Sequence, residues 1–211
     1  MEIQMHRKTR KTTVRSFVIP IAAAIALAAA ALFAYNAWES DHGEGEAEKA
    51  LAVLKPEIKK YAHLREKAVV IGAPEVDGMP SIRVDGIEYI GELRIPDLGM
   101  DLPIRASVDY TKLKESPCRY SGSYIDDSLV ICAHDYSKKF SRLSSLQDGS
   151  ELFFTNVNGE VYRYVIRSHR RVNDEDIGKL TDGAAFDVAL VTCNMGGQAG
   201  YAAWCVRAED D

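Results

Sequence analysis

Two segments of this sequence place a reactive side chain directly after an apolar run. The first is Leu129-Val-Ile-Cys-Ala-His134, and the second is Val188-Ala-Leu-Val-Thr-Cys193, which leads into a glycine-containing loop. A histidine at a strand end is held by rigid backbone yet open to solvent, and its unperturbed pKa near 6.5 suits proton transfer. A cysteine beside such a base can act as a nucleophile. The pattern predicts a Cys193–His134 pair for nucleophilic catalysis.

Each of these residues also has a purely structural interpretation. A cysteine at the end of an apolar strand is often a small buried hydrophobic residue, and a single histidine is often structural. The other histidines are weaker candidates for proton transfer. They lie in a basic tail, an acidic spacer, an expected helix and a basic strand end: His6, His42, His63 and His169.

The four cysteines, Cys118, Cys132, Cys193 and Cys205, form no C-x-x-C pair and have no histidine at metal-ligand spacing. We therefore expect no metal site and no cofactor, and a thiol redox protein is disfavoured. If Cys193 stays a thiol, the other three can form at most one disulfide. The sequence does not indicate which pair that is.

The second half of the chain has the texture of an all-β domain, with short apolar runs between turn residues. An Asn-Val-Asn-Gly tetrad at 156–159 predicts a hairpin, and residues 138–146 and 174–180 carry the few helical signals. The expected strands are residues 88–95, 100–104, 128–133, 151–156, 161–170, 186–192 and 202–206.

The N-terminal segment predicts a membrane anchor. Residues 16–38 hold no charged side chain, and as a helix they would span roughly 34 Å, enough for a bilayer core of about 30 Å. The net charge of −5 divides into +4 for residues 1–15 and −9 for the rest. The basic tail predicts a cytoplasmic N-terminus and an exterior domain, and the acidic remainder argues against a nucleic-acid partner. A cleaved signal peptide is the alternative, although its apolar stretch is usually shorter.

Four parts are therefore expected: a basic tail at 1–15, the anchor at 16–38, an acidic spacer and helical stalk at 39–82, and a β domain at 83–211. Apolar residues recur at helical spacing over 51–64, with Pro56 among them. This pattern predicts two short helices or one kinked helix, either a stalk or a helix packed on the domain. A short dimerising coiled coil is a further alternative.

Three motifs in this order resemble those of sortases, cysteine transpeptidases of the Gram-positive cell surface. They are the stretch from Tyr89 to Ile104, the Ala-His134 segment with Phe140 downstream, and Leu190-Val-Thr-Cys193, which is similar to the family's T-L-x-T-C signature. The resemblance covers about residues 86–209. It implies an eight-stranded sortase-like β-barrel with short helices, with His134 and Cys193 matching the catalytic pair.

The resemblance also implies a function at the cell membrane. The exterior domain would cleave the C-terminal sorting signal of secreted proteins and form a thioacyl intermediate on Cys193. The acyl group would pass to an amine of a cell-wall precursor or a pilin.

The chain departs from the family pattern at one position. Similar sequences read T-C-x-x-G-G-x-S-R, and the residue at the place of that arginine is Gly200. Either the arginine is absent, as an ungapped match favours, or a longer loop brings Arg207 into its role. Absence leaves open a catalytically weak or inactive module that binds sorting-signal peptides or assists a partner sortase.

Overall fold

The structure is a computed structural model, and it describes residues 10–65, 75–109, 113, 115–134, 140–173, 176, 186–193 and 199–208. The chain divides into two compact units, residues 1–41 and 42–211. Helix α1 (Arg10–Arg65) begins in the first unit and ends in the second. Its stretch Val18–Glu39 has 22 residues with a mean hydropathy of 2.3, and none of it is buried. This stretch is long and apolar enough to cross a membrane, as residues 16–38 predicted.

In the second unit, α1 packs on the β domain. Ala50, Leu54 and Ile58 form a buried cluster with Val84 and Tyr89. These positions follow the helical spacing of the sequence, and they favour the alternative of a helix packed on the domain. α1 is a single helix through Pro56, because packing on both sides of the proline offsets the hydrogen bond that its ring removes.

The remaining elements are eleven strands and two short 3₁₀ helices within the described residues. They are β1 (Glu75–Val76), β2 (Met79–Pro80), β3 (Ile82–Val84), β4 (Ile87–Ile95), η1 (Pro96–Leu98), β5 (Met100–Arg105), β6 (Cys118–Ser121), β7 (Leu129–His134), η2 (Phe140–Ser145), β8 (Glu151–Asn156), β9 (Val161–Arg171), β10 (Val188–Cys193) and β11 (Ala199–Arg207).

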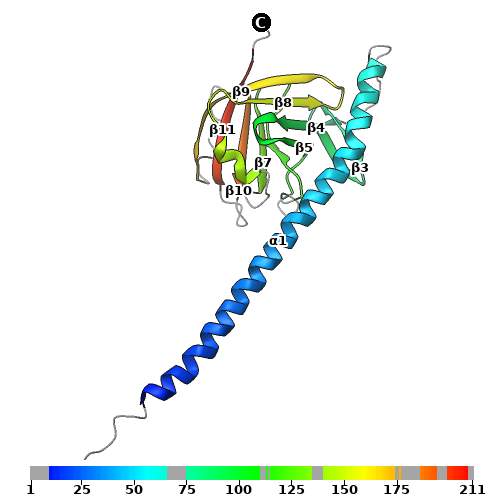
Figure 1. Ribbon diagram of the computed structural model, residues 1–211. Coiled ribbons are helices and arrows are strands. Elements are labelled where there is room, and N and C mark those ends of the chain that lie inside the picture. Colours follow the sequence, from blue (N-terminus) through cyan, green and yellow to red (C-terminus); the bar gives the residue numbers. More distant parts are fainter. Residues whose placement is uncertain are drawn as a thin grey trace, which may run out of the picture. The chain divides into compact units, whose positions relative to one another are not determined.

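Nine strands form one sheet in the order β3-β4-β5-β6-β7-β10-β11-β9-β8, and β8 also pairs with β4. This last pairing closes eight strands into a barrel and leaves β3 as an extra strand on β4 (Figure 1). The closure depends on Gly91, because a Cβ atom there would lie 2.2 Å from the carbonyl oxygen of Thr155 on β8. The expected eight-stranded barrel is confirmed.

The interior of the barrel is filled by alternate residues of its strands. On β10, for example, Val188 and Leu190 belong to the main core cluster, as expected for side chains that alternate between two faces. Phe140 and Leu143 of η2 join this cluster. Phe140, at 1 % exposure, is therefore part of the barrel core.

All seven expected strands are present, each within two or three residues of its predicted ends. The strands that the sequence did not indicate, such as β3 and β6, have three or four residues, too few for an alternating pattern. Residues 138–146 contain the 3₁₀ helix η2 rather than an α-helix. Of the expected helix at 174–180, all but residue 176 lies outside the described residues.

Candidate active site

His134 and Cys193 are neighbours across two parallel strands. β7 and β10 pair in parallel with an unbroken register, from Leu129 opposite Val188 to His134 opposite Cys193. Both residues are the last of their strands, so the two strands end level at one edge of the barrel. Adjacent strands lie about 4.8 Å apart. The sheet therefore brings together two residues that stand 59 positions apart in the sequence.

The side chain of His134 belongs to the outer face of the sheet. On β7, Ile131 and Ala133 belong to the interior core, whereas Cys132 belongs to a second apolar cluster on the outer face. His134 follows Cys132 by two residues and is therefore also on the outer face. On β10, Val191 belongs to the same outer cluster.

The outer face of β7 and β10 is covered by other segments. Leu113, Val172 and Phe186 lie in the outer cluster, and the backbone N–H of His134 donates to the carbonyl oxygen of Leu113 at 3.4 Å. The side chain of His134 is 7 % exposed. The expectation of an open, solvated His134 was wrong: its side chain is buried and its backbone is bonded to Leu113.

The register places Arg207 at the far end of the neighbouring strand from Cys193. β10 and β11 are antiparallel, with Cys193 opposite Ala199 and Val188 opposite Cys205. Five residue steps along β10 correspond to roughly 17 Å, and Arg207 lies two residues beyond Cys205. No side chain can bridge that distance. Arg207 therefore does not replace the arginine that sortase-like sequences carry near the cysteine.

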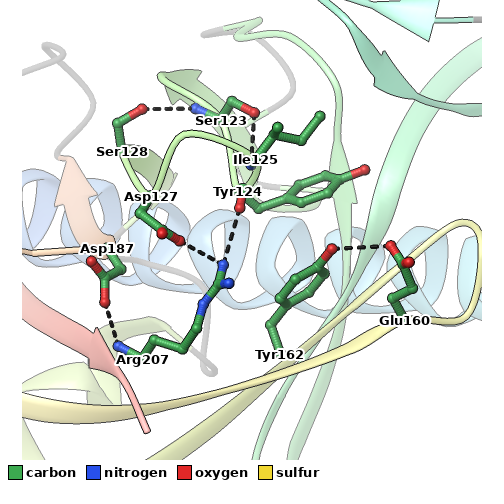
Figure 2. A network of polar contacts seen from close by, with 9 residues as sticks. All are labelled: Ser123, Tyr124, Ile125, Asp127, Ser128, Glu160, Tyr162, Asp187 and Arg207. Carbon is green, nitrogen blue, oxygen red and sulfur yellow. Dashed lines mark hydrogen bonds and ion pairs between the residues drawn. The ribbon is translucent and has the colours of Figure 1, made fainter. Parts of the chain in front are cut away.

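Arg207 is instead the centre of a polar network at the other end of the barrel (Figure 2). Its backbone N–H donates to Asp187 at 2.5 Å. Its guanidinium donates to Asp127 at 2.5 Å and to the carbonyl oxygen of Tyr124 at 3.2 Å, and it lies 4.8 Å from the ring centre of Tyr162. These contacts hold the turn between β6 and β7 against the end of β11.

Two buried tyrosines lie beside this network. Burial raises the pKa of Tyr124 to about 12 and the pKa of Tyr164 to about 12, since a phenolate loses solvation inside the barrel. Both therefore remain neutral at physiological pH and serve packing.

Gly200 occupies the place beside Cys193. Thr192 pairs with Tyr201 and Cys193 pairs with Ala199, so Gly200 is the extra residue of a bulge on β11. A Cβ atom on Gly200 would lie 3.1 Å from Oγ1 of Thr192. The glycine at the place of the family's arginine therefore follows directly after Ala199, the residue paired with Cys193, and no guanidinium extends from this position.

The other expected thiols and histidines lie elsewhere. Cys205 is in the barrel interior, and burial raises the pKa of its thiol far above the ordinary value, which makes it a poor nucleophile. His169 contacts Asp148, with Nδ1 3.1 Å from Oδ1. His6 lies outside the described residues. Within the described part of the chain, no three His, Cys, Asp or Glu residues gather into a group that could hold a metal ion.

Comparison with known proteins agrees with the fold. Residues 93–210, more than half of the chain, match the sortase domain family. The chain belongs to the sortase family. Its sequence is 23 % identical to Sortase A of Bacillus anthracis over 169 residues, which is 75 % of this chain and 77 % of that protein.

Solved structures of sortases share the fold. Sortase D5, a transpeptidase of Clostridium perfringens, superimposes with a TM-score of 0.56 at 15 % identity, covering 78 % of this chain and 99 % of that one. Sortase C of Clostridium perfringens with the C-terminal cell wall sorting motif superimposes with a TM-score of 0.51 at 19 % identity, covering 82 % and 99 %.

The outer cluster around the site was not foreseen from the sequence. Its members come from four strands, β6, β7, β10 and β11, and from residues between strands, so no periodic pattern marks them. The sequence held one sign of this cluster, because cysteine is often a small buried hydrophobic residue. Cys118 is the first residue of β6 and Cys132 lies within β7, and both belong to the cluster. Their pairing across β6 and β7 became visible only in the folded sheet.

Proposed function

We propose that this sortase family member is a membrane-anchored cysteine transpeptidase, with Cys193 as nucleophile and His134 as its proton-transfer partner. The observation that supports the pair best is its register: the two residues are opposite each other on adjacent parallel strands, at the same edge. A nucleophile and its base need to be within hydrogen-bond reach, and opposite positions on adjacent strands about 4.8 Å apart are compatible with that.

The proposed reaction has two steps. The Cys193 thiolate attacks the scissile carbonyl carbon, the C–N bond breaks, and His134 donates a proton to the departing amine. The acyl group is then held as a thioester on Cys193. An incoming amine attacks this thioester while His134 accepts its proton, which forms the new amide and restores the Cys193 thiolate.

The proposed substrate is a C-terminal sorting signal of a secreted protein, the class of peptide present in the solved structure of Clostridium perfringens sortase C. The proposed acceptor is an amine of a cell-wall precursor or of a pilin. Both assignments come from the family likeness.

Gly200 predicts that turnover is slow. An oxyanion that develops during thiolate attack needs donors, and one donor typically contributes about 100- to 1,000-fold in turnover. Because no side chain stands at Gly200, the oxyanion relies on backbone N–H groups. A non-catalytic module that only binds sorting-signal peptides is the alternative that this position favours.

Mass spectrometry of the full chain after incubation with a library of sorting-signal peptides tests the proposal. The expected result is an acyl adduct on the Cys193 peptide that hydroxylamine removes, as expected for a thioester. Cys193→Ala is the matched control and should show no adduct. Peptide binding without an adduct in the unchanged chain would support the non-catalytic alternative.

We further propose that Val18–Glu39 spans the cell membrane, with the barrel outside. The 22-residue apolar stretch and the basic residues before it support this orientation, because cytoplasmic flanks carry the excess of Lys and Arg. Protease added to intact cells should remove the barrel and spare an epitope on the N-terminal tail. Protection of the barrel until the cells are lysed would contradict this orientation.

A further inference from the structure

Two cysteines face each other on the outer side of the sheet. Cys118 of β6 and Cys132 of β7 are directly opposite in the antiparallel register. Both are buried, at 1 % and 2 % exposure, and their sulfur atoms are 3.6 Å apart. The two side chains belong to the same outer apolar cluster.

The backbone positions suit a covalent bond between these sulfurs. Residues opposite each other on antiparallel strands have Cα atoms about 4.5 or 5.5 Å apart, and disulfides span Cα separations of about 4.4 to 6.8 Å. A sulfur–sulfur bond is about 2.05 Å long, so the two atoms need to approach by about 1.5 Å. Rotation about the two Cα–Cβ bonds changes this distance.

We propose that Cys118 and Cys132 form a disulfide in the exported protein and thereby join β6 to β7. The proposal rests on the proposed exterior location, where disulfides form and persist. The reaction is thiol–disulfide exchange with an oxidising disulfide, either of an oxidoreductase or of a small molecule. One thiolate attacks that disulfide and expels a thiolate, and the second cysteine then displaces the remaining partner. Two electrons pass to the oxidant, which leaves as two thiols after taking up the two protons.

The remaining cysteines do not compete for this bond in the folded barrel. Cys205 lies in the barrel interior, on the opposite side of the sheet from the outer cluster. Cys132 is opposite Val191 on β10, which stands two residues before Cys193.

The disulfide would keep Cys132 from reacting with the proposed nucleophile, Cys193. An oxidised Cys193–Cys132 bridge would block the thiolate that the reaction needs. With Cys132 bound to Cys118, no bridge between Cys132 and Cys193 can form. The bond also fixes β7 two residues before His134.

Thiol mapping of the full chain tests this inference. Protein isolated from cells in acid is alkylated in denaturant with one reagent, then reduced, and alkylated with an isotopically heavy form. Cys118 and Cys132 should carry only the heavy label, and the unreduced digest should contain their two peptides joined. Cys193 and Cys205 should carry the light label. Light label on Cys118 and Cys132 would overturn the proposal, as would a cross-link to Cys193 or Cys205.

A second experiment does not depend on the export route. The reduced full chain in detergent is incubated with oxidised glutathione, and its mass should fall by about two units, the two hydrogens lost on oxidation. The midpoint of thermal unfolding should rise by several degrees, since the bond restricts the unfolded chain. Cys205→Ser should behave in the same way, whereas Cys118→Ser should show neither change. Failure of the unchanged chain to form the bond would overturn the inference, while a missing acyl adduct on Cys193 would bear only on the proposed function.

Discussion

The side chain of Thr192 on β10 lies against the backbone of Gly200 on β11: a Cβ atom on Gly200 would be 3.1 Å from Oγ1 of Thr192. The φ angle of Gly200 is not among the positive values of the chain, so an L-residue fits its backbone. Its one close contact is a hydroxyl group, which needs to move by only a few tenths of an ångström.

Gly200→Arg should therefore fold and raise turnover, by up to roughly 100-fold, because it supplies a guanidinium beside Cys193. The measurement is the rate of amide formation with a sorting-signal peptide and an amine. Gly200→Ala is the control, since it adds the same Cβ atom without a donor, and it should give no gain. An equal gain from both variants would contradict the oxyanion explanation.

Substitution of Cys193 should affect activity far more than substitution of Cys132. Cys193→Ala should abolish transpeptidation, whereas Cys132→Ala should retain most of it, because Cys193 is the residue opposite His134 and Cys132 is opposite Val191. Cys118→Ala is the matched control, because it removes the same contact between the Cys118 and Cys132 sulfurs and leaves Cys132 in place. If Cys132→Ala were as inactive as Cys193→Ala while Cys118→Ala stayed active, the assignment of the nucleophile would be wrong.

Removal of the guanidinium of Arg207 should lower stability and leave turnover nearly unchanged. Arg207→Ala loses a partly exposed ion pair with Asp127 and a contact with the ring of Tyr162. The expected cost in unfolding free energy is about 1–2 kcal/mol. Thermal unfolding and the turnover number of the same preparation check both parts. A large fall in turnover without a fall in stability would mean that Arg207 acts at the site.

Alkaline pH should destabilise the barrel through Tyr124 and Tyr164. Burial raises the pKa of each to about 12 in the folded protein, against about 10 in the unfolded chain. Between these values the unfolded chain loses protons that the folded chain keeps, so stability is full below about pH 10 and is lost toward pH 12. Each tyrosine contributes a slope of about 1.4 kcal/mol per pH unit in this window. Tyr124→Phe or Tyr164→Phe should reduce the slope of unfolding free energy against pH, as measured by urea unfolding at a series of pH values.

The packing of α1 on the barrel can be tested at the turn between β8 and β9. Gly159 has a φ of +81°, and a Cβ atom there would lie 2.3 Å from Cβ of Ala62 on α1. Gly149 has a φ of +92° and no neighbour within 4 Å, so Gly149→Ala measures backbone strain alone, about 1–2 kcal/mol.

Gly159→Ala should lower the free energy of unfolding more than the control Gly149→Ala does. The additional loss should be roughly 1–3 kcal/mol, because the new methyl group overlaps with Ala62. Chemical denaturation of the full chain in detergent gives both values. The double variant Gly159→Ala with Ala62→Gly removes the overlapping methyl group and should regain part of this additional loss of stability. The gain is reduced by about 1 kcal/mol, the cost of a glycine inside a helix. Equal losses for Gly149→Ala and Gly159→Ala would show that α1 does not contact this turn in solution.

Several features of this protein were readable from local sequence alone. The long strands carry alternating or apolar runs, so residues 88–95 and 161–170 were placed close to β4 and β9. The uncharged stretch at 16–38 coincides with the apolar part of α1. Such features depend on residues within one turn or one strand, and the order of motifs around His134 and Cys193 was enough to indicate the family.

The tertiary structure decided what depends on pairing between distant segments. The sequence did not determine whether Arg207 or a bare Gly200 stands beside Cys193, because a loop of uncertain length precedes β11. The antiparallel register of β10 and β11 settles the position of Arg207, since one step of register moves a residue by about 3.3 Å along the strand. The burial of His134 by the segment at Leu113 and the approach of Cys118 to Cys132 have the same origin. In each case the contact is set by how separate segments pair, which no single segment encodes.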